Sequence, residues 1–173
     1  QLFFKGLIGA FTLDQIVNNY IHPNQLDSGS RIDDNDNDLL SGDNNYTDME
    51  HKWDEGFGYL YGLEGDNLVN AGASPSGNGS LLMKYFKKVD EEGGYEPGIG
   101  QVVYDAFIMG RTAIVNKDYE LRDQQAAIIK VELSKVIGYY AIHYMNDYVA
   151  KLEAGNVAKA HHSLSEAWGF LLS

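Results

Sequence analysis

Residues 50–60 decide the fold, and they read Glu-His-Lys-Trp-Asp-Glu-Gly-Phe-Gly-Tyr-Leu. A degenerate copy lies near the C-terminus, where residues 162–171 read His-Ser-Leu-Ser-Glu-Ala-Trp-Gly-Phe-Leu. We call the two stretches motif 1 and motif 2. Aligned without gaps, they share the pattern His-x-x-x-Glu-small-aromatic-Gly-aromatic-Leu. This recurrence indicates a shared architectural role for the two stretches.

Each motif carries a histidine and a glutamate four residues apart: His51 with Glu55, and His162 with Glu166. Residues four apart lie on one face of a helix, so each motif would present an imidazole beside a carboxylate. Such a pair is half of a metal site. It is equally typical of an ordinary stabilising pair on an amphipathic helix, and the spacing alone leaves both interpretations open.

Composition limits the classes of function. The chain has 173 residues, 44% of them hydrophobic, which is enough for one substantial core in a single domain, residues 1–173. No apolar run is long enough to cross a bilayer, so we expect no transmembrane segment. The net charge of −12 argues against nucleic acid as a partner and favours cations or neutral ligands. The absence of cysteine excludes disulfides and thiolate metal sites.

Helical spacing of apolar residues predicts helices over residues 2–20, 81–89, 99–114 and 119–152. Thr47 and Glu50 form a capping box that starts the helix of motif 1, and Asp118 is placed to cap the longest helix. Residues 154–156 separate that helix from the helix of motif 2. No strand-like alternation persists anywhere. The sequence therefore predicts an all-α fold, a bundle of five or six helices with two long loops.

The two predicted loops cover residues 24–45 and 62–80. The first contains an acidic run, residues 33–38, in which aspartates alternate as in an EF-hand calcium loop. Leu39 stands where that loop needs glycine, and Asn45 stands where it needs a bidentate glutamate. A solvated or weakly cation-binding loop is the simpler interpretation. The second loop lacks the glycine spacing of a phosphate-binding loop.

Two further residues are candidates for a site. His143 lies among the tyrosines of the longest predicted helix, where a histidine is more often a hydrogen-bonded core residue but could complete a site with the motif pairs. Arg111 is the one cation well inside the predicted helix of residues 99–114.

Three stretches together resemble a known family. They are Glu-His-x-Trp-Asp-Glu-x-Phe-Gly-Tyr in motif 1, Gly-Arg-Thr-Ala-Ile at residues 110–114, and His-x-x-Ser-Glu-Ala-Trp-Gly-Phe in motif 2. They resemble an uncharacterised family of bacterial surface lipoproteins, the domain of unknown function 4856, which looks related to the imelysin-like proteins. The resemblance implies two pseudo-symmetric helical bundles, export to the periplasm or outer surface, and an association with iron or haem acquisition. It also implies that the chain is the C-terminal part of a larger two-bundle domain whose N-terminal segment is missing.

Imelysin-like proteins carry a Gly-x-His-x-x-Glu motif proposed to bind metal. The nearest match here is residues 49–54, Met-Glu-His-Lys-Trp-Asp, which has Met for the leading Gly and Asp for the closing Glu. On this resemblance, His51 and Asp54 supply a nitrogen and an oxygen ligand three residues apart.

The leading hypothesis is a non-enzymatic, exported imelysin-like protein that binds a metal ion or a metal-containing small ligand for uptake. Its metal ligands would be His51, Asp54, Glu55, His162 and Glu166, with His143 and Arg111 as additional candidates. Nitrogen and oxygen donors suit iron or a divalent cation such as zinc.

Two other hypotheses stay open. In one, the motifs pack one helix pair against another, and the tyrosines and loops of a surface scaffold contact a protein or glycan. In the other, the protein is a metal-dependent hydrolase such as a peptidase, with Glu55 or Glu166 as the base, although His-Glu-x-x-His is missing. Convergence of the two motifs would favour metal binding, and motifs on separate faces would favour packing.

Overall fold

The computed structural model describes residues 1–62, 79–91 and 93–173. The elements are α1 (Leu2–Ile8), the π-helical segments η1 (Gly9–Leu13) and η2 (Gln15–Tyr20), α2 (Pro23–Leu26), α3 (Arg31–Asp36), α4 (Asp48–Tyr61), α6 (Leu81–Asp90), α7 (Ile99–Val115), α8 (Tyr119–Glu153) and α9 (Val157–Leu171). The described residues contain no strand, and Leu40 and Thr47 form one isolated bridge. The all-α prediction is confirmed. If the helical run from α1 to η2 is taken as one helix, it forms the predicted bundle together with α4, α6, α7, α8 and α9.

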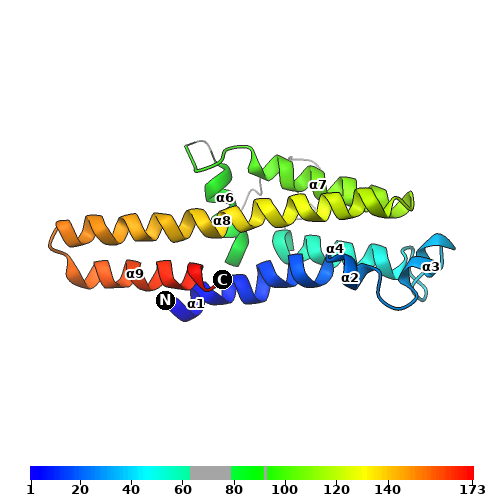
Figure 1. The fold of residues 1–173 in the computed structure, drawn as a ribbon, viewed down its shortest axis with the longest axis horizontal. Coiled ribbons are helices and arrows are strands. Elements are labelled where there is room, and N and C mark those ends of the chain that lie inside the picture. The colour runs from blue at the N-terminus through cyan, green and yellow to red at the C-terminus, as the bar shows by residue number, and fades with distance from the viewer. Residues whose placement is uncertain (63–78, 92) are drawn as a thin grey trace.

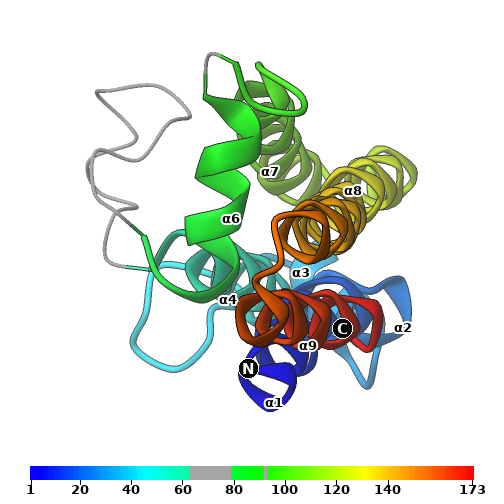
Figure 2. The same ribbon diagram turned by 90° about the vertical axis from the view of Figure 1, so that its left-hand side faces the viewer.

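Helix α8 runs along the long axis of the molecule (Figure 1). Its 35 residues span about 52 Å at 1.5 Å per residue. Helix α9 returns along one half of α8, and α7 runs along the other half (Figure 1). The N-terminal run packs against α9 through α1 and against α4 through η2, and Figure 2 shows this layer beneath α8.

Local signals fix the helix ends where the sequence predicts them. The Thr47 side chain accepts from the Glu50 backbone N–H while Glu50 accepts from the Thr47 backbone, so the capping box is present. Asp118 Oδ1 accepts from the Leu121 backbone N–H at 3.0 Å and caps α8. These side chains satisfy backbone donors that the first helical turn leaves unpaired.

The prediction of one loop over residues 24–45 is wrong, because the segment holds α2 and α3. His22 Nδ1 accepts from the Asn24 backbone N–H at 3.2 Å, and Pro23 occupies the first turn of α2. Asn35, in α3, is buried and donates to the Ile114 carbonyl oxygen at 2.9 Å. The acidic run is thus helical through Asp36. Of the other predicted loop, residues 63–78 lie outside the described residues.

The apolar residues of α8 lie on two faces. One face is buried in the core and includes Ile129, Leu133, Val136 and Tyr140. The other carries exposed side chains at heptad-like spacing: Ile128, Val131, Ile142, Met145, Val149 and Leu152. The apolar residues of this helix therefore form more than one stripe at helical spacing.

Trp53 packs α4 against α7. Its side chain is 1% exposed, and its Nε1–H donates to the Phe107 carbonyl oxygen at 2.9 Å. The indole fills a notch left by Gly110, where an added Cβ would lie 2.0 Å from Trp53 Cζ2. Motif 1 therefore places its tryptophan where α7 has no side chain, and the two helices approach closely.

We predict that Gly110→Ala lowers the free energy of unfolding by about 1–3 kcal/mol, because the new methyl group overpacks the notch. Gly138→Ala on the exposed face of α8 is the matched control, since nothing lies within 4 Å of its added Cβ. The control should gain about 0.5–1 kcal/mol from helix propensity. Denaturant unfolding measures both, and a Gly110→Ala protein as stable as the parent would contradict this packing.

Candidate functional site

Both histidine–glutamate pairs form as the spacing predicts. In motif 1, on α4, His51 Nε2 lies 3.9 Å from Glu55 Oε1. In motif 2, on α9, His162 Nε2 lies 3.4 Å from Glu166 Oε2. The helices α4 and α9 occupy different halves of the long axis (Figure 1). Among the described residues, no three or more His, Asp or Glu side chains are grouped to hold a metal ion.

The two motifs turn different faces to the core. Motif 1 buries Trp53 and Leu60, whereas motif 2 buries Glu166 and Phe170. The glycines show the same difference. An added Cβ at Gly169 would lie 2.4 Å from Lys5 Cβ, so α1 packs closely on α9. Gly58, the aligned residue in motif 1, has nothing within 4 Å of an added Cβ, so no helix packs closely there.

The neighbouring Gly56 does pack closely. A Cβ added there would lie 2.7 Å from Ile21 Cγ2, at the end of the N-terminal helical run. Each motif therefore uses one glycine to bring a neighbouring helix near, and the two glycines occupy different positions of the shared pattern.

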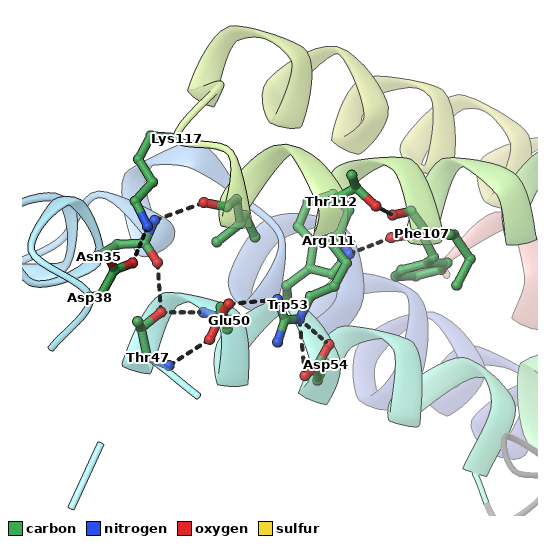
Figure 3. Close-up of polar contacts among 12 residues, drawn as sticks. Asn35, Asp38, Thr47, Glu50, Trp53, Asp54, Phe107, Arg111, Thr112 and Lys117 are labelled. Carbon is green, nitrogen blue, oxygen red and sulfur yellow. Dashed lines mark hydrogen bonds and ion pairs between the residues drawn. The ribbon is translucent and has the colours of Figure 1, made fainter. Parts of the chain in front are cut away.

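Arg111 joins α7 to the acidic side of motif 1 (Figure 3). Its Nη1 lies 2.8 Å from Glu50 Oε1, and its Nε lies 3.1 Å from Asp54 Oδ1. Glu50 also accepts from the Thr47 backbone N–H at 2.7 Å. Partial burial raises the pKa of Asp54, and the Arg111 guanidinium opposes that rise. Two candidate residues, Asp54 and Arg111, thus belong to one ion-pair network.

His143 lies elsewhere, in a pocket of about 520 Å³ beside the middle of α8. We call it the tyrosine pocket, and its lining residues are Lys88, Glu91, Gly93, Gly94, Tyr95, Tyr140, His143 and Tyr144. The Tyr95 hydroxyl lies 3.0 Å from His143 Nδ1, at hydrogen-bond distance. The volume falls within the range usual for small-ligand sites.

A tightly built turn between α6 and α7 holds Tyr95 in place. Asp90 Oδ1 accepts from the backbone N–H groups of Gly98, at 3.0 Å, and Gly100, at 2.8 Å. An added Cβ at Gly94 would lie 2.5 Å from the Lys88 carbonyl oxygen, so the turn closes only around glycine.

Glu96 connects this turn to α8 through hydrogen bonds. Its carboxylate accepts from Lys135 Nζ at 2.9 Å and from the Tyr139 hydroxyl at 2.8 Å. These two hydrogen bonds lower the pKa of Glu96. The Tyr95 ring stacks on Tyr139, with ring centroids 5.2 Å apart. Tyr95 is therefore aligned along α8 beside His143.

Motif 2 forms the back of the tyrosine pocket. The rings of Tyr140 and Tyr144 pack on Phe170, with centroids 5.6 Å and 5.9 Å away. Lys5 Nζ lies 5.9 Å from the Tyr144 ring centroid and 3.3 Å from Glu166 Oε1. Burial raises the pKa of Tyr140 to about 12, so its phenol is neutral at pH 7.

Three lysines of α6 lie beside the pocket, and one of them, Lys88, lines it. Lys84, Lys87 and Lys88 line an adjoining hollow of about 470 Å³, which shares Lys88 and Glu91 with the tyrosine pocket. Three cations in two turns of α6 form a local positive patch in a chain of net charge −12. The site thus combines aromatic walls with an edge that carries three lysines and one glutamate, Glu91.

The sequence predicts that His143 lies among the tyrosines of the longest helix, but it does not predict the pocket. Tyr140 and Tyr144 are four residues apart, which placed them on one face of α8. Tyr95 comes from a turn more than forty residues earlier in the chain, and no local pattern predicts that approach.

Comparison with protein families gives one match. The model described as Domain of unknown function (DUF4856) matches residues 1–173. The chain belongs to this family. Comparisons with curated proteins and with solved structures found no match. In the described part of this DUF4856 chain, every helix is too short or too polar to cross a membrane.

We predict a pH effect from Asp54 when Arg111 is replaced by glutamine. Folding raises the pKa of Asp54, so its ionisation opposes the folded state: stability is highest below the unfolded pKa and falls as pH rises through the folded pKa. Arg111→Gln removes the guanidinium that lowers the pKa of Asp54. The loss of stability with rising pH should therefore become larger and extend to higher pH. Carboxyl ¹³C NMR titration measures the pKa directly.

The control for this effect is the double variant Asp54→Asn/Arg111→Gln. Like Arg111→Gln, it lacks the ion pair between Arg111 and Glu50, but it has no carboxyl at position 54. Its stability should therefore lack the added pH dependence. An unchanged Asp54 pKa in Arg111→Gln would show that the ion pair does not form in solution.

Proposed function

We propose that the protein is a non-enzymatic binding module whose tyrosine pocket takes a small ligand with a flat face and an anionic group. The observation that carries the proposal is the tyrosine pocket itself, with aromatic rings along one side and lysines at its edge. Aromatic walls with a few convergent polar groups are typical of small-molecule sites.

The rings supply a rigid surface for a flat ligand. Tyr140, His143 and Tyr144 lie in mutual contact on α8, with ring centroids 5.2–6.0 Å apart. Tyr95 adds a fourth ring from the α6–α7 turn. The core packing behind them limits their movement, so little conformational entropy is lost when a ligand binds.

The lysines supply the selectivity for charge. Lys84 and Lys88 are exposed on α6 and border the pocket or the hollow that adjoins it. The acidic remainder of the chain repels anions, so a local cationic edge directs an anionic ligand to this place.

A binding measurement tests the proposal. Metal-free protoporphyrin IX, which is flat and carries carboxylates, should bind and quench tyrosine and tryptophan fluorescence. The Lys84→Gln/Lys88→Gln variant should bind it about tenfold more weakly, since each exposed charge contributes about 0.5–1 kcal/mol. Added salt should weaken binding to the parent more than to the variant.

Lys130→Gln/Lys159→Gln is the matched control, because both lysines are exposed, on α8 and α9, and the variant removes two positive charges elsewhere. It should bind the porphyrin as the parent does. Neutral cellohexaose provides the comparison for a glycan site. Binding of cellohexaose but not of the porphyrin would overturn the proposal in favour of a glycan, and binding of neither would overturn the pocket as a site.

A second candidate function is metal binding at the motif pairs. The observation in its favour is that His51 and His162 are each placed beside a carboxylate. Each pair offers two ligands, so water or a chelating ligand would have to complete the coordination. Glu166 is also engaged by Lys5, and a metal would compete with that ion pair.

Elemental analysis of protein purified without chelator tests this second candidate. It predicts stoichiometric iron or zinc that disappears in the His51→Ala/His162→Ala variant. If the purified parent contains no metal and binds none on titration, and if the variant still folds, the metal hypothesis is wrong. The motifs would then serve only in helix packing.

A further inference from the structure

The exposed face of α8 has a residue spacing that neither the core nor the tyrosine pocket uses. Eight residues lie on this face at alternating steps of three and four, which is the a/d spacing of a coiled coil. We call them the α8 seam: Ile128, Val131, Lys135, Gly138, Ile142, Met145, Val149 and Leu152. The six large apolar side chains of the seam are 37–57% exposed. Such a stripe is typical of a helix that pairs with another helix.

We infer that the α8 seam is a dimer interface, in which α8 packs antiparallel on α8 of a second copy of this chain. The seam is about 36 Å long from Ile128 to Leu152, at 1.5 Å per residue. The inference is independent of the proposed function, because no seam residue lines the tyrosine pocket.

The seam is complementary to itself about a two-fold axis at the level of residue 140. When two copies run antiparallel about that axis, each seam residue faces a seam residue of the partner subunit. The facing pairs are Leu152 with Ile128, Val149 with Val131, Met145 with Lys135, and Ile142 with Gly138. A Cβ added at Gly138 would have no neighbouring heavy atom within 4 Å. Gly138 therefore leaves room for the larger side chain of Ile142 opposite.

Charge and shape both favour the antiparallel orientation over the parallel one. In a parallel dimer with a two-fold axis, Lys135 would face Lys135 and Gly138 would face Gly138. Like charges would then be opposed, and a gap would lie one turn away. In the antiparallel dimer the alkyl chain of Lys135 lies against Met145. Its ammonium keeps the ion pairs with Glu96, at 2.9 Å, and Glu132, at 2.7 Å.

The residues that flank the seam allow two acidic copies to approach. The antiparallel register places Glu132 beside Asn146 of the partner subunit, and it places Glu153 beside Gln125 in the same way. Neither carboxylate meets a carboxylate, although each copy carries a net charge of −12. The other flank holds four uncharged residues: Ala127, Ser134, Ala141 and Tyr148.

Sedimentation equilibrium of the whole chain tests the interface. The parent should be monomeric at about 1 µM and dimeric at about 1 mM, since a strip one helix wide is a small interface and should bind reversibly. Val149→Glu should raise the dissociation constant of the dimer by about tenfold or more, because the new carboxylate faces Val131 of the partner subunit. Two such carboxylates enter each dimer.

Ala150→Glu is the matched control. Ala150 is exposed on α8 one residue outside the seam, so the variant adds the same charge and should dimerise as the parent does. Circular dichroism should show the same helix content in the parent and both variants. A parent that stays monomeric at about 1 mM, or a dimer that Val149→Glu leaves intact, would overturn the inference and leave the proposed function standing.

Cysteine cross-linking tests the orientation, because the chain has no cysteine of its own. Ile128→Cys and Leu152→Cys, mixed and mildly oxidised, should form a disulfide between the two variants, since these positions face each other. Each variant alone should give little cross-linked dimer. Efficient cross-linking of each variant alone, without the mixed product, would show a parallel dimer and overturn the antiparallel arrangement.

Discussion

The length of α8 is the constraint on which the rest of the structure depends. One helix of 35 residues is too long for a single partner, so α7 covers one half and α9 covers the other. The two partner helices end near the middle of α8, where Glu96 reaches Lys135 and Tyr139 from one side and Phe170 reaches Tyr140 from the other. The tyrosine pocket forms at this junction, because the α6–α7 turn and α6 cover α8 there instead of a long helix.

The two motifs serve this architecture differently. Motif 1 joins α4 to α7 through Trp53 in the notch at Gly110 and through Arg111 with its two carboxylates. Motif 2 joins α9 to α1 at Gly169 and places Phe170 behind the tyrosine pocket. Their helices present different faces to the core. Each motif therefore brings a neighbouring helix close, through a glycine at a different position of the shared pattern, and the pocket belongs to the surroundings of motif 2.

Most helices could be predicted because their signals are local. Apolar spacing over residues 119–152 and the cap at Asp118 both depend on residues a few positions apart, and α8 follows them. The short helices α2 and α3 were missed because they are polar and are held by distant partners, as when Asn35 reaches the Ile114 carbonyl oxygen. The candidate site was missed for the same reason. His143 and Tyr144 are visible on one helix, but Tyr95 arrives through a turn whose course depends on Glu96 meeting Lys135.

The central claim is that the ligand site lies at the middle of α8 and not at the acidic face of α4. Chemical-shift mapping by ¹H–¹⁵N NMR, with metal-free protoporphyrin IX added to the labelled protein, tests this claim most directly. The account predicts perturbed amides at Lys88, Tyr95, His143 and Tyr144, with those of His51 and Asp54 unchanged. Perturbations confined to α4 and α7 around Arg111, or none at any amide, would contradict it.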